Sequence, residues 1–248
     1  MNRLTILGSG FAVANQNQEN SYLLFQGSNR VVLIDCGNNP VGKMQRIGVS
    51  IIEVTDLVLT HAHADHMGTL PLLLMDMWLM KRTTELNIYG LKYTLDKAKS
   101  LLSVFDWEKW ANMFKVNFVE VSDEGIQKVI DDQVRIFTGP VLHLIPTVGV
   151  RIEIPETGKT LVYSCDGEPC ENLDKLAAGA TVLLQETAGP GKGHTSAEEA
   201  GKNAARAGAS ELIFIHYPAD ANESTLVQEA ASYFEGKIKI GKDLMYFE

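Results

Sequence analysis

A short segment, residues 60–66, reads THAHADH and holds three of the six histidines of the chain. Alternate side chains of an extended segment point the same way, so His61 and His63 can both reach one metal ion. Asp65 and His66 lie just beyond them and can face a second ion. Imidazole nitrogen and carboxylate oxygen at short spacing are ligands that a divalent ion such as zinc prefers. The segment therefore predicts a metal site rather than a histidine-rich surface turn.

Further candidate ligands stand where strand-like apolar runs end. Active sites collect at such places, because a rigid sheet fixes loop residues that stay free to bind. Any one of these residues alone would more often be structural, but together with residues 60–66 they indicate one site. Four apolar runs lead to such residues: 57–59 to His61, 141–142 to His143, 161–163 to Asp166 and 212–215 to His216.

The order of these ligands resembles the metallo-β-lactamase superfamily in its two-metal form. The pattern His-x-His-x-Asp-His is followed by a distant His, Asp and His, and Asp35 and Gly37 close an early strand as in the superfamily's first motif. The resemblance implies an α/β fold, a four-layer αββα sandwich with both metals at one edge. It also implies the ligand sets: His61, His63 and His143 for the first ion, Asp65, His66 and His216 for the second, and Asp166 as the bridge.

Two later stretches resemble ribonuclease Z and its short bacterial relatives. They are residues 185–188 (QETA) and 193–200 (GHTSAEEA). In that family a histidine and small hydroxyl residues face the scissile phosphate, which implies that His194, Thr195 and Ser196 bind substrate. Both hydroxyl residues stand three positions before a glutamate, the spacing of a capping box, and a helix beginning there presents free N–H groups to an anion. The alternative is that Thr195 or Ser196 only caps a helix and that His194 is a surface residue.

One departure separates this chain from full-length ribonuclease Z. That family carries an arm that grips transfer RNA, between the ligands that match His143 and Asp166. Residues 144–165 read here as a tight hairpin with no room for an arm. The formal net charge is −9, which gives no basic nucleic-acid footprint. We therefore expect a small-molecule or short nucleotide phosphodiester as the substrate, and we expect transfer RNA not to be one.

The expected cofactors are two divalent ions, with zinc favoured and manganese or iron left open. Two ions that share a water would lower its pKa towards neutrality, and this metal-bridging hydroxide would attack phosphorus in line. The ions would also stabilise the transition-state oxygens electrostatically. Asp65 and His194 are the expected catalytic residues. Asp65 is a ligand that can also orient the hydroxide, and His194 is the general acid or a partner of the phosphate oxygens.

Three other functions fit parts of the pattern. The same ligand set serves carbonyl chemistry, so a thioester or lactone hydrolase of the same fold is the main alternative. A di-iron redox protein is less favoured, because the resembling members usually carry glutamate in place of His63. A non-catalytic binding module is disfavoured by the complete ligand set, since decayed relatives tend to lose ligands.

The remaining sequence predicts one mixed α/β domain over residues 1–248, with no internal repeat or linker. The tryptophans, Trp107 among them, are expected in the core. Predicted strands are residues 4–7, 22–25, 31–34, 57–59, 116–121, 134–138, 148–154, 160–164, 182–184, 212–215 and a last stretch to 247. Predicted helices are residues 42–47, 67–81, 93–104, 106–114, 197–207 and 224–234.

Bulk features place the chain in the cytoplasm and off the membrane. Cys36, Cys165 and Cys170 are an odd, sparse set, typical of free thiols in a reducing compartment. The start of the chain does not resemble a signal peptide. The most apolar stretch, residues 70–80, is too short to span a bilayer. A homodimer is suggested only by the family resemblance.

Overall fold

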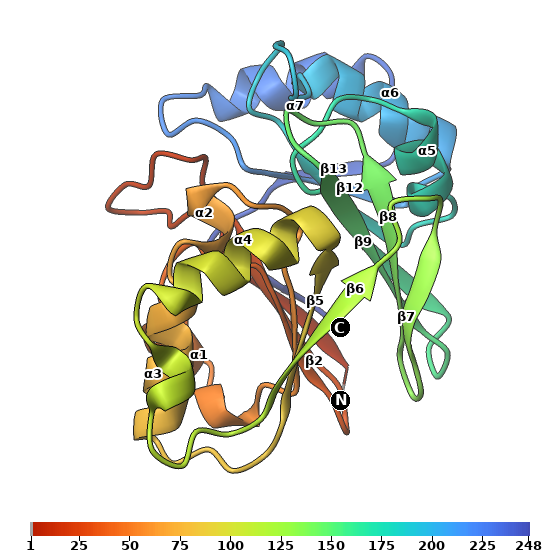
Figure 1. Ribbon diagram of the computed structural model, residues 1–248. Helices are drawn as coiled ribbons and strands as arrows, with labels where there is room; N and C mark the ends of the chain where they lie inside the picture. The colour runs from red at the N-terminus through yellow and green to blue at the C-terminus, as the bar shows by residue number, and fades with distance from the viewer. Residues whose placement is uncertain (1) are drawn as a thin grey trace.

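The computed structural model describes residues 2–248, which form two β-sheets packed between two layers of helices (Figure 1). The first sheet has the strand order β14-β1-β2-β3-β4-β5-β6 and the second β13-β12-β11-β10-β9-β8-β7. This is the predicted four-layer αββα sandwich. The first sheet consists of β1 (Arg3–Gly8), β2 (Tyr22–Gln26), β3 (Val31–Ile34), β4 (Asp56–Val58), β5 (Leu86–Leu91), β6 (Val116–Val121) and β14 (Tyr246–Phe247). The second consists of β7 (Gln127–Asp131), β8 (Arg135–Val141), β9 (Thr147–Ile154), β10 (Lys159–Tyr163), β11 (Val182–Glu186), β12 (Glu211–Ile215) and β13 (Lys237–Ile240).

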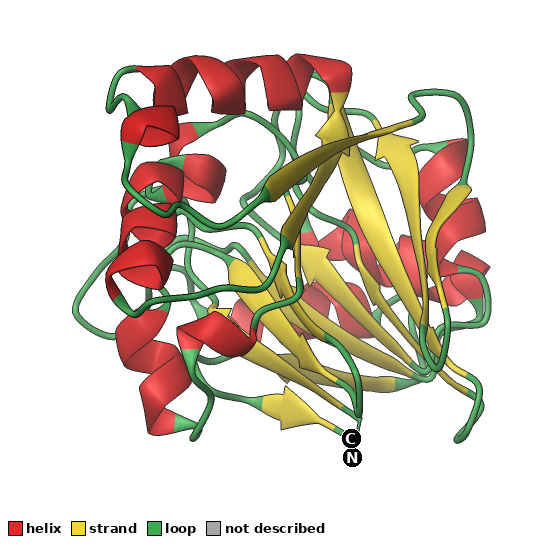
Figure 2. Cartoon of the chain, turned by 60° about the horizontal axis from the view of Figure 1, so that its bottom comes forward, coloured by secondary structure: helices red, strands yellow, loops and turns green. Residues whose placement is uncertain are grey.

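The helices cover the outer faces of the two sheets, and Figure 2 shows them on both sides of the strands. In Figure 1, α1, α3 and α4 lie on one outer side, and α5, α6 and α7 lie on the other. The helices are α1 (Val41–Arg46), α2 (Ala64–Met67), α3 (Leu70–Leu79), α4 (Lys92–Ser103), α5 (Glu171–Ala177), α6 (Ala197–Ala207) and α7 (Glu223–Ala231), with short 3₁₀ turns η1 (Ile51–Glu53) and η2 (Trp107–Lys109).

The central strands are apolar on both faces because each face is covered. In β12, Ile213 and Ile215 belong to the core between the sheets, whereas Leu212 and Phe214 pack under the helices. In β3, Ile34 faces the core between the sheets, and Leu33 faces the helices on the other side. Strands buried on both faces read as continuous apolar runs, which is why the sequence reveals them so clearly.

The direction of the strands brings the candidate ligands to one edge. β3 to β6 run parallel to one another, and β10 to β13 do the same in the second sheet. The carboxyl ends of parallel strands lie at the same edge of a sheet, where loops are free to bind. The two sheets are tied at this edge by a hydrogen bond from the Val148 amide to the Thr60 carbonyl, 3.1 Å long.

Several predicted elements differ from the structure. The helix predicted for residues 106–114 is wrong, because Asp106 adopts a left-handed conformation (φ 49°) and only Trp107–Lys109 form a single 3₁₀ turn. The helix predicted for residues 67–81 is shorter, α3 at Leu70–Leu79, since Thr69 is not helical (φ −95°, ψ 9°) and separates it from α2, which ends at Met67. Strands β5 and β7 and helix α5 are additions, and the last predicted stretch to residue 247 contains two strands, β13 and β14. In β5 the polar Asn87 and the flexible Gly90 break the alternation that would have revealed a strand.

The predicted hairpin between His143 and Asp166 is confirmed. β9 and β10 pair antiparallel, with Ile154 opposite Lys159 and Val150 opposite Tyr163. Only the turn at residues 155–158 joins them. The chain therefore carries no arm at this position.

The apolar stretch and the cysteines agree with the sequence analysis. Among residues 2–248, none of the helices combines the length and the apolar character needed to cross a membrane. The three cysteines are free thiols; Cys36 and Cys165 are buried and Cys170 is half-buried.

Gly37 is the point where the loop after β3 meets the loop after β4. A Cβ built at Gly37 would lie 1.6 Å from the backbone oxygen of Asp65. We predict that Gly37→Ala displaces the Asp65 segment, lowers the free energy of unfolding by about 1–3 kcal/mol and reduces the metal retained per chain. Thermal unfolding and elemental analysis measure these effects.

Gly42→Ala is the matched control, because a Cβ built at Gly42 meets no atom within 4 Å. This glycine lies inside α1, so alanine should stabilise the fold by about 0.5–1 kcal/mol. Equal stability and metal content in the two variants would contradict the role assigned to Gly37.

Candidate metal centre and active site

The structure brings the predicted ligands together at the loop edge of the sandwich. Each follows the end of a strand or begins the short helix α2, so backbone geometry fixed by the sheets determines where the side chains point. The ligand-bearing segments are His61 and His63 after β4, Asp65 and His66 in α2, His143 after β8, Asp166 after β10 and His216 after β12.

The first group contains His61, His63, His143 and Asp166, and its donor atoms all lie within 4.8 Å of one another. Nδ1 of His63 lies 3.0 Å from Nε2 of His61 and 3.3 Å from Nε2 of His143. Burial lowers the pKa of all three imidazoles below the ordinary value. Metal ligation requires the neutral imidazole, so these residues are already in the binding form at neutral pH.

The second group contains Asp65, His66, Asp166 and His216, again with donor atoms within 4.8 Å. Nε2 of His66 lies 3.5 Å from Oδ2 of Asp65, and Nε2 of His216 lies at the same distance from that oxygen, 3.5 Å. Burial opposes the charged form of Asp65, but the hydrogen bond with His216 lowers the pKa of this carboxyl. The group therefore presents two imidazoles and an ionised carboxylate.

Asp166 belongs to both groups through a single oxygen. Its Oδ2 lies 3.9 Å from Nε2 of His61, 3.4 Å from Nε2 of His66 and 3.3 Å from Nε2 of His216. Burial opposes its charged form, but His216 and His66 hold the pKa of Asp166 well below the usual range. A buried carboxylate between two imidazole groups is the arrangement that a bridging ligand requires.

The donor atoms of the two ligand groups are chemically suited to bind a pair of divalent ions. Nε2 of His66 and Oδ1 of Asp166 are buried and make no hydrogen bond with the described residues. Orphaned buried polar atoms are costly, and a metal ion would satisfy such atoms. The imidazole and carboxylate set suits zinc, and manganese and iron also accept it. The predicted ligands thus fall into the two predicted groups, and their binding of metal stays a prediction.

Outer hydrogen bonds fix which nitrogen of each histidine is free. Nδ1 of His143 donates to the carbonyl of Gly193 at 2.5 Å, so its Nε2 is unprotonated when the ring is neutral. Nδ1 of His66 donates to Oδ2 of Asp35 at 2.8 Å, with the same consequence. Metal-binding histidines usually donate their second N–H in this way, which orients the ring.

Asp35 also reaches His61 through a hydroxyl. The Thr60 hydroxyl donates to Oδ2 of Asp35 at 2.7 Å and lies 3.1 Å from Nδ1 of His61. The Thr60 amide donates to the other oxygen of Asp35 at 2.8 Å. Asp35 is fully buried, so one carboxylate orients a histidine in each ligand group. Sequence analysis placed Asp35 in a motif but did not give it this role.

Backbone strain collects at the strand ends beside the centre. Asp35, Cys165 and His216 have positive φ values of 65°, 57° and 53°. Residues with side chains adopt this left-handed region at a cost, and it recurs at functional sites. Here it turns the chain sharply after β3, β10 and β12, which directs the Asp166 and His216 side chains to the site.

His194 lies beside the ligand groups and pairs with a buried carboxylate. Its ring is stacked on that of His216 with centroids 5.9 Å apart, and Nδ1 donates to Oε1 of Glu186 at 3.2 Å. The hydrogen bond to Glu186 raises the pKa of His194. A histidine with a raised pKa is protonated over a wider pH range, as a proton donor requires.

Glu186 is a site residue that sequence analysis did not assign. Its carboxylate is fully buried and accepts hydrogen bonds from the amides of Gly167, Ala188 and Thr195 as well as from His194. The carboxylate therefore anchors the loop that carries His194. The available signal was its place at the end of β11, the same strand-end position that the metal-type residues occupy.

Thr195 and Ser196 serve the scaffold in this structure. The Thr195 hydroxyl is buried and donates to the Gly167 carbonyl at 2.5 Å. The Ser196 hydroxyl accepts from the Glu199 amide at 3.2 Å and caps α6. The predicted capping by Ser196 is confirmed, whereas substrate binding by Thr195 and Ser196 stays a prediction.

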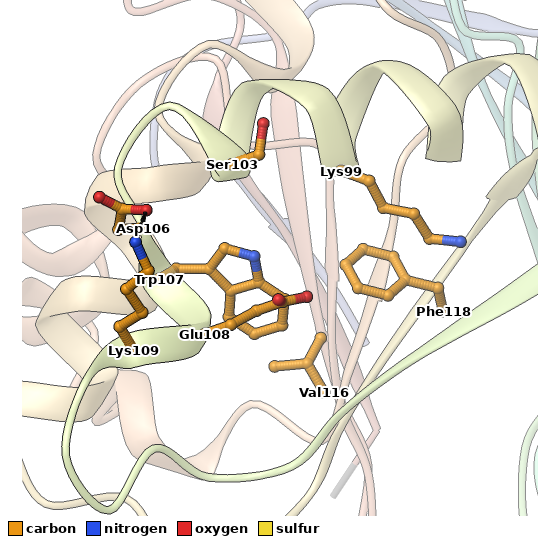
Figure 3. A pocket seen from close by; sticks show the side chains of 8 residues that line it. All are labelled: Lys99, Ser103, Asp106, Trp107, Glu108, Lys109, Val116 and Phe118. Atoms are coloured by element: carbon orange, nitrogen blue, oxygen red, sulfur yellow. Dashed lines mark ion pairs between the residues drawn. The ribbon is translucent and has the colours of Figure 1, made fainter.

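A separate cavity of 480 Å³ lies between α4, η2 and β6 (Figure 3). Its aromatic lining is formed by Trp107 and Phe118, whose ring centroids are 6.2 Å apart, with Lys99 Nζ 5.0 Å from the Phe118 ring. None of its lining residues belongs to a ligand group. Trp107 packs against the core and also borders this cavity, so the expectation that it is a core residue is only partly met.

Comparisons with known proteins agree with the fold. The profile of the family described as "Anti-Pycsar protein Apyc1" matches residues 2–237. A ribonuclease Z of Mycobacterium avium is 30% identical over 273 residues, covering 98% of this chain and 97% of that protein. Because 273 aligned positions exceed the 248 residues of this chain, that relative carries insertions that this chain lacks.

Solved structures show the same fold at lower identity. The metallo-β-lactamase fold protein YhfI of Bacillus subtilis superposes with a TM-score of 0.84 at 22% identity, covering 99% of this chain and 98% of that one. The short form of human tRNase Z superposes with a TM-score of 0.79 at 19% identity, with coverage of 99% and 98%.

Asp35→Asn tests the outer hydrogen bonds. The neutral amide of asparagine accepts hydrogen bonds from His66 and Thr60 less strongly than the carboxylate does. The affinity for metal should therefore fall about 10–100-fold. Competition with a chromophoric chelator measures this affinity. Asp96→Asn is the control, because Asp96 is an exposed residue of α4 paired with Lys92. Equal affinities in the two variants would refute the role of Asp35.

Proposed function

The chain belongs to the family described as anti-Pycsar protein Apyc1, within the metallo-β-lactamase superfamily that includes ribonuclease Z, and on that basis we propose a dinuclear-metal phosphodiesterase. Membership makes the protein a metal-dependent hydrolase. The observation that carries the phosphodiesterase proposal is His194, which is held on Glu186 and stacked on His216, a neighbour of the shared carboxylate of Asp166. Its substrate would be a small or single-stranded phosphodiester, such as a cyclic nucleotide.

In this proposal the residues divide their roles as the geometry groups them. His61, His63 and His143 would hold one ion, Asp65, His66 and His216 the other, and Asp166 both. Bound ions, with zinc favoured, would supply Lewis acidity and a water of lowered pKa. Since the ligands come from both sheets, we propose that residues 1–248 work as one domain.

The remaining chemistry belongs to side chains of this chain. Asp65 has an ionised carboxylate at the edge of the second group and would orient the attacking water. His194 would give its proton to the departing oxygen, while Glu186 keeps the ring in place and protonated. General acid catalysis of this kind contributes about 10²–10⁴-fold in rate.

The compact hairpin favours a small substrate over transfer RNA. Only four residues, 155–158, join β9 and β10, and the chain has a net charge of −9. Phosphate contacts by Lys and Arg dominate the affinity of nucleic-acid binders, and this chain has 22 Lys and Arg against 31 Asp and Glu. The ribonuclease Z relatives make RNA the second candidate substrate. Their family also suggests that this chain forms a homodimer. Light scattering would test this.

Metal content and substrate choice give the first test. We expect about two equivalents of zinc per chain and chelator-sensitive cleavage of bis-p-nitrophenyl phosphate. Precursor transfer RNA and a thioester are the comparison substrates. Cleavage of the thioester but not of the phosphodiester would shift the function to carbonyl hydrolysis. A metal-free protein that stays inactive after reconstitution would refute the metal centre.

His194→Ala tests the proposed proton donor. An alkoxide leaving group needs a proton, so turnover of a cyclic nucleotide should fall about 10²–10⁴-fold. Turnover of bis-p-nitrophenyl phosphate should fall less, because p-nitrophenolate leaves without protonation. Metal content should be unchanged. Loss of metal in this variant would instead make His194 a ligand or a structural support.

A further inference from the structure

Phe11 lies at the metal centre although sequence analysis did not select it. Its ring centroid is 5.1 Å from that of His216 at an interplanar angle of 67°, and 6.2 Å from that of His194 at 62°. Both contacts are edge-to-face. The phenyl ring therefore borders the two histidines that, in the proposed function, hold metal and donate the proton.

The ring is not part of the packed interior. Phe11 is half-buried, and among residues 2–248 it neither belongs to any of the hydrophobic core clusters nor packs against one. A phenylalanine usually contributes to stability by burying its ring. Here the aromatic contacts made by the ring are to site histidines, so its placement serves the site.

Hydrogen bonds hold the Phe11 backbone in place. The Asn20 side-chain amide donates to the carbonyls of Phe11 and Ala12, each at 2.9 Å. Two residues before Phe11, the carbonyl of Ser9 accepts a hydrogen bond of 2.9 Å from the His216 amide. The ring is thereby fixed relative to His216, and a preorganised contact loses little entropy on binding.

A second exposed apolar side chain lies in the loop after β8, against the residue that precedes His194. Leu144 is 51% exposed. A Cβ built at Gly193 would lie 2.7 Å from its Cγ, so Leu144 packs on the residue before His194.

We propose that Phe11 is the aromatic wall of a subsite for the planar base of a nucleotide whose phosphate lies at the metal centre. The inference rests on the proposed function, which places the phosphate beside His194 and His216. An aromatic ring with a half-exposed surface is suited to stacking, and every nucleobase offers a π-face. Phe11 thus determines specificity for phosphodiesters that carry a base over those that do not.

Binding of two matched ligands tests the inference without requiring turnover. The zinc-loaded protein is titrated by calorimetry with adenosine 5′-monophosphate and with ribose 5-phosphate, which lacks the base. Stacking on an aromatic side chain should give the wild type a preference of about tenfold for the nucleotide. Phe11→Ala should lose this preference, Phe11→Tyr should keep it, and affinity for ribose 5-phosphate should change little in either.

Phe105→Ala is the control, because Phe105 is an exposed ring just beyond the end of α4 and should leave the preference unchanged. Thermal unfolding of each variant separates a lost subsite from a lost fold. A preference that persists in Phe11→Ala, or a wild type without one or without binding of either ligand, would overturn the inference. Failure to cleave bis-p-nitrophenyl phosphate with the preference intact would refute the proposed function alone.

Discussion

The carboxylate of Asp166 is the contact on which the arrangement of the site depends. One of its oxygens lies 3.4 Å from His66 and 3.3 Å from His216, within a region that excludes water. A buried anion is costly unless positive charge or hydrogen bonds surround it. The surrounding imidazoles meet this requirement in part, and two divalent ions would meet it in full. The fold must therefore hold the ligand-bearing loops close to Asp166 when no ion is bound.

The sandwich meets this demand through strand direction and a few tight backbone turns. Parallel strands in both sheets end at the same edge, and the Val148–Thr60 hydrogen bond joins the sheets there. Left-handed conformations at Asp35 and His216 redirect the chain within one residue of a rigid strand. Gly37 allows the Asp65 backbone to approach more closely than any side chain would permit. Rigid sheets and strained turns together make the donor geometry independent of flexible loops.

Two buried carboxylates outside the ligand set, Asp35 and Glu186, orient the histidines of the site. Asp35 orients His66 directly and His61 through Thr60, whereas Glu186 organises the loop that carries His194. The same loop binds His143 through the Gly193 carbonyl. Metal binding, proton donation and loop structure are thus coupled through a small set of hydrogen bonds.

The sequence by itself determined the donor types, because residues 61–66 concentrate them locally and apolar runs mark the strand ends that carry the others. The apolar runs also predicted a mixed α/β domain, since strands buried on both faces read as continuous apolar runs, and the family resemblance implied the four-layer sandwich. Other features depended on contacts between distant residues, such as His66 with Asp35, 31 positions apart, and Phe11 with His216. Local spacing carries no record of such pairs. The helix expected at residues 106–114 is absent because Asp106, at its start, is left-handed and a single 3₁₀ turn follows, which helical periodicity does not reveal.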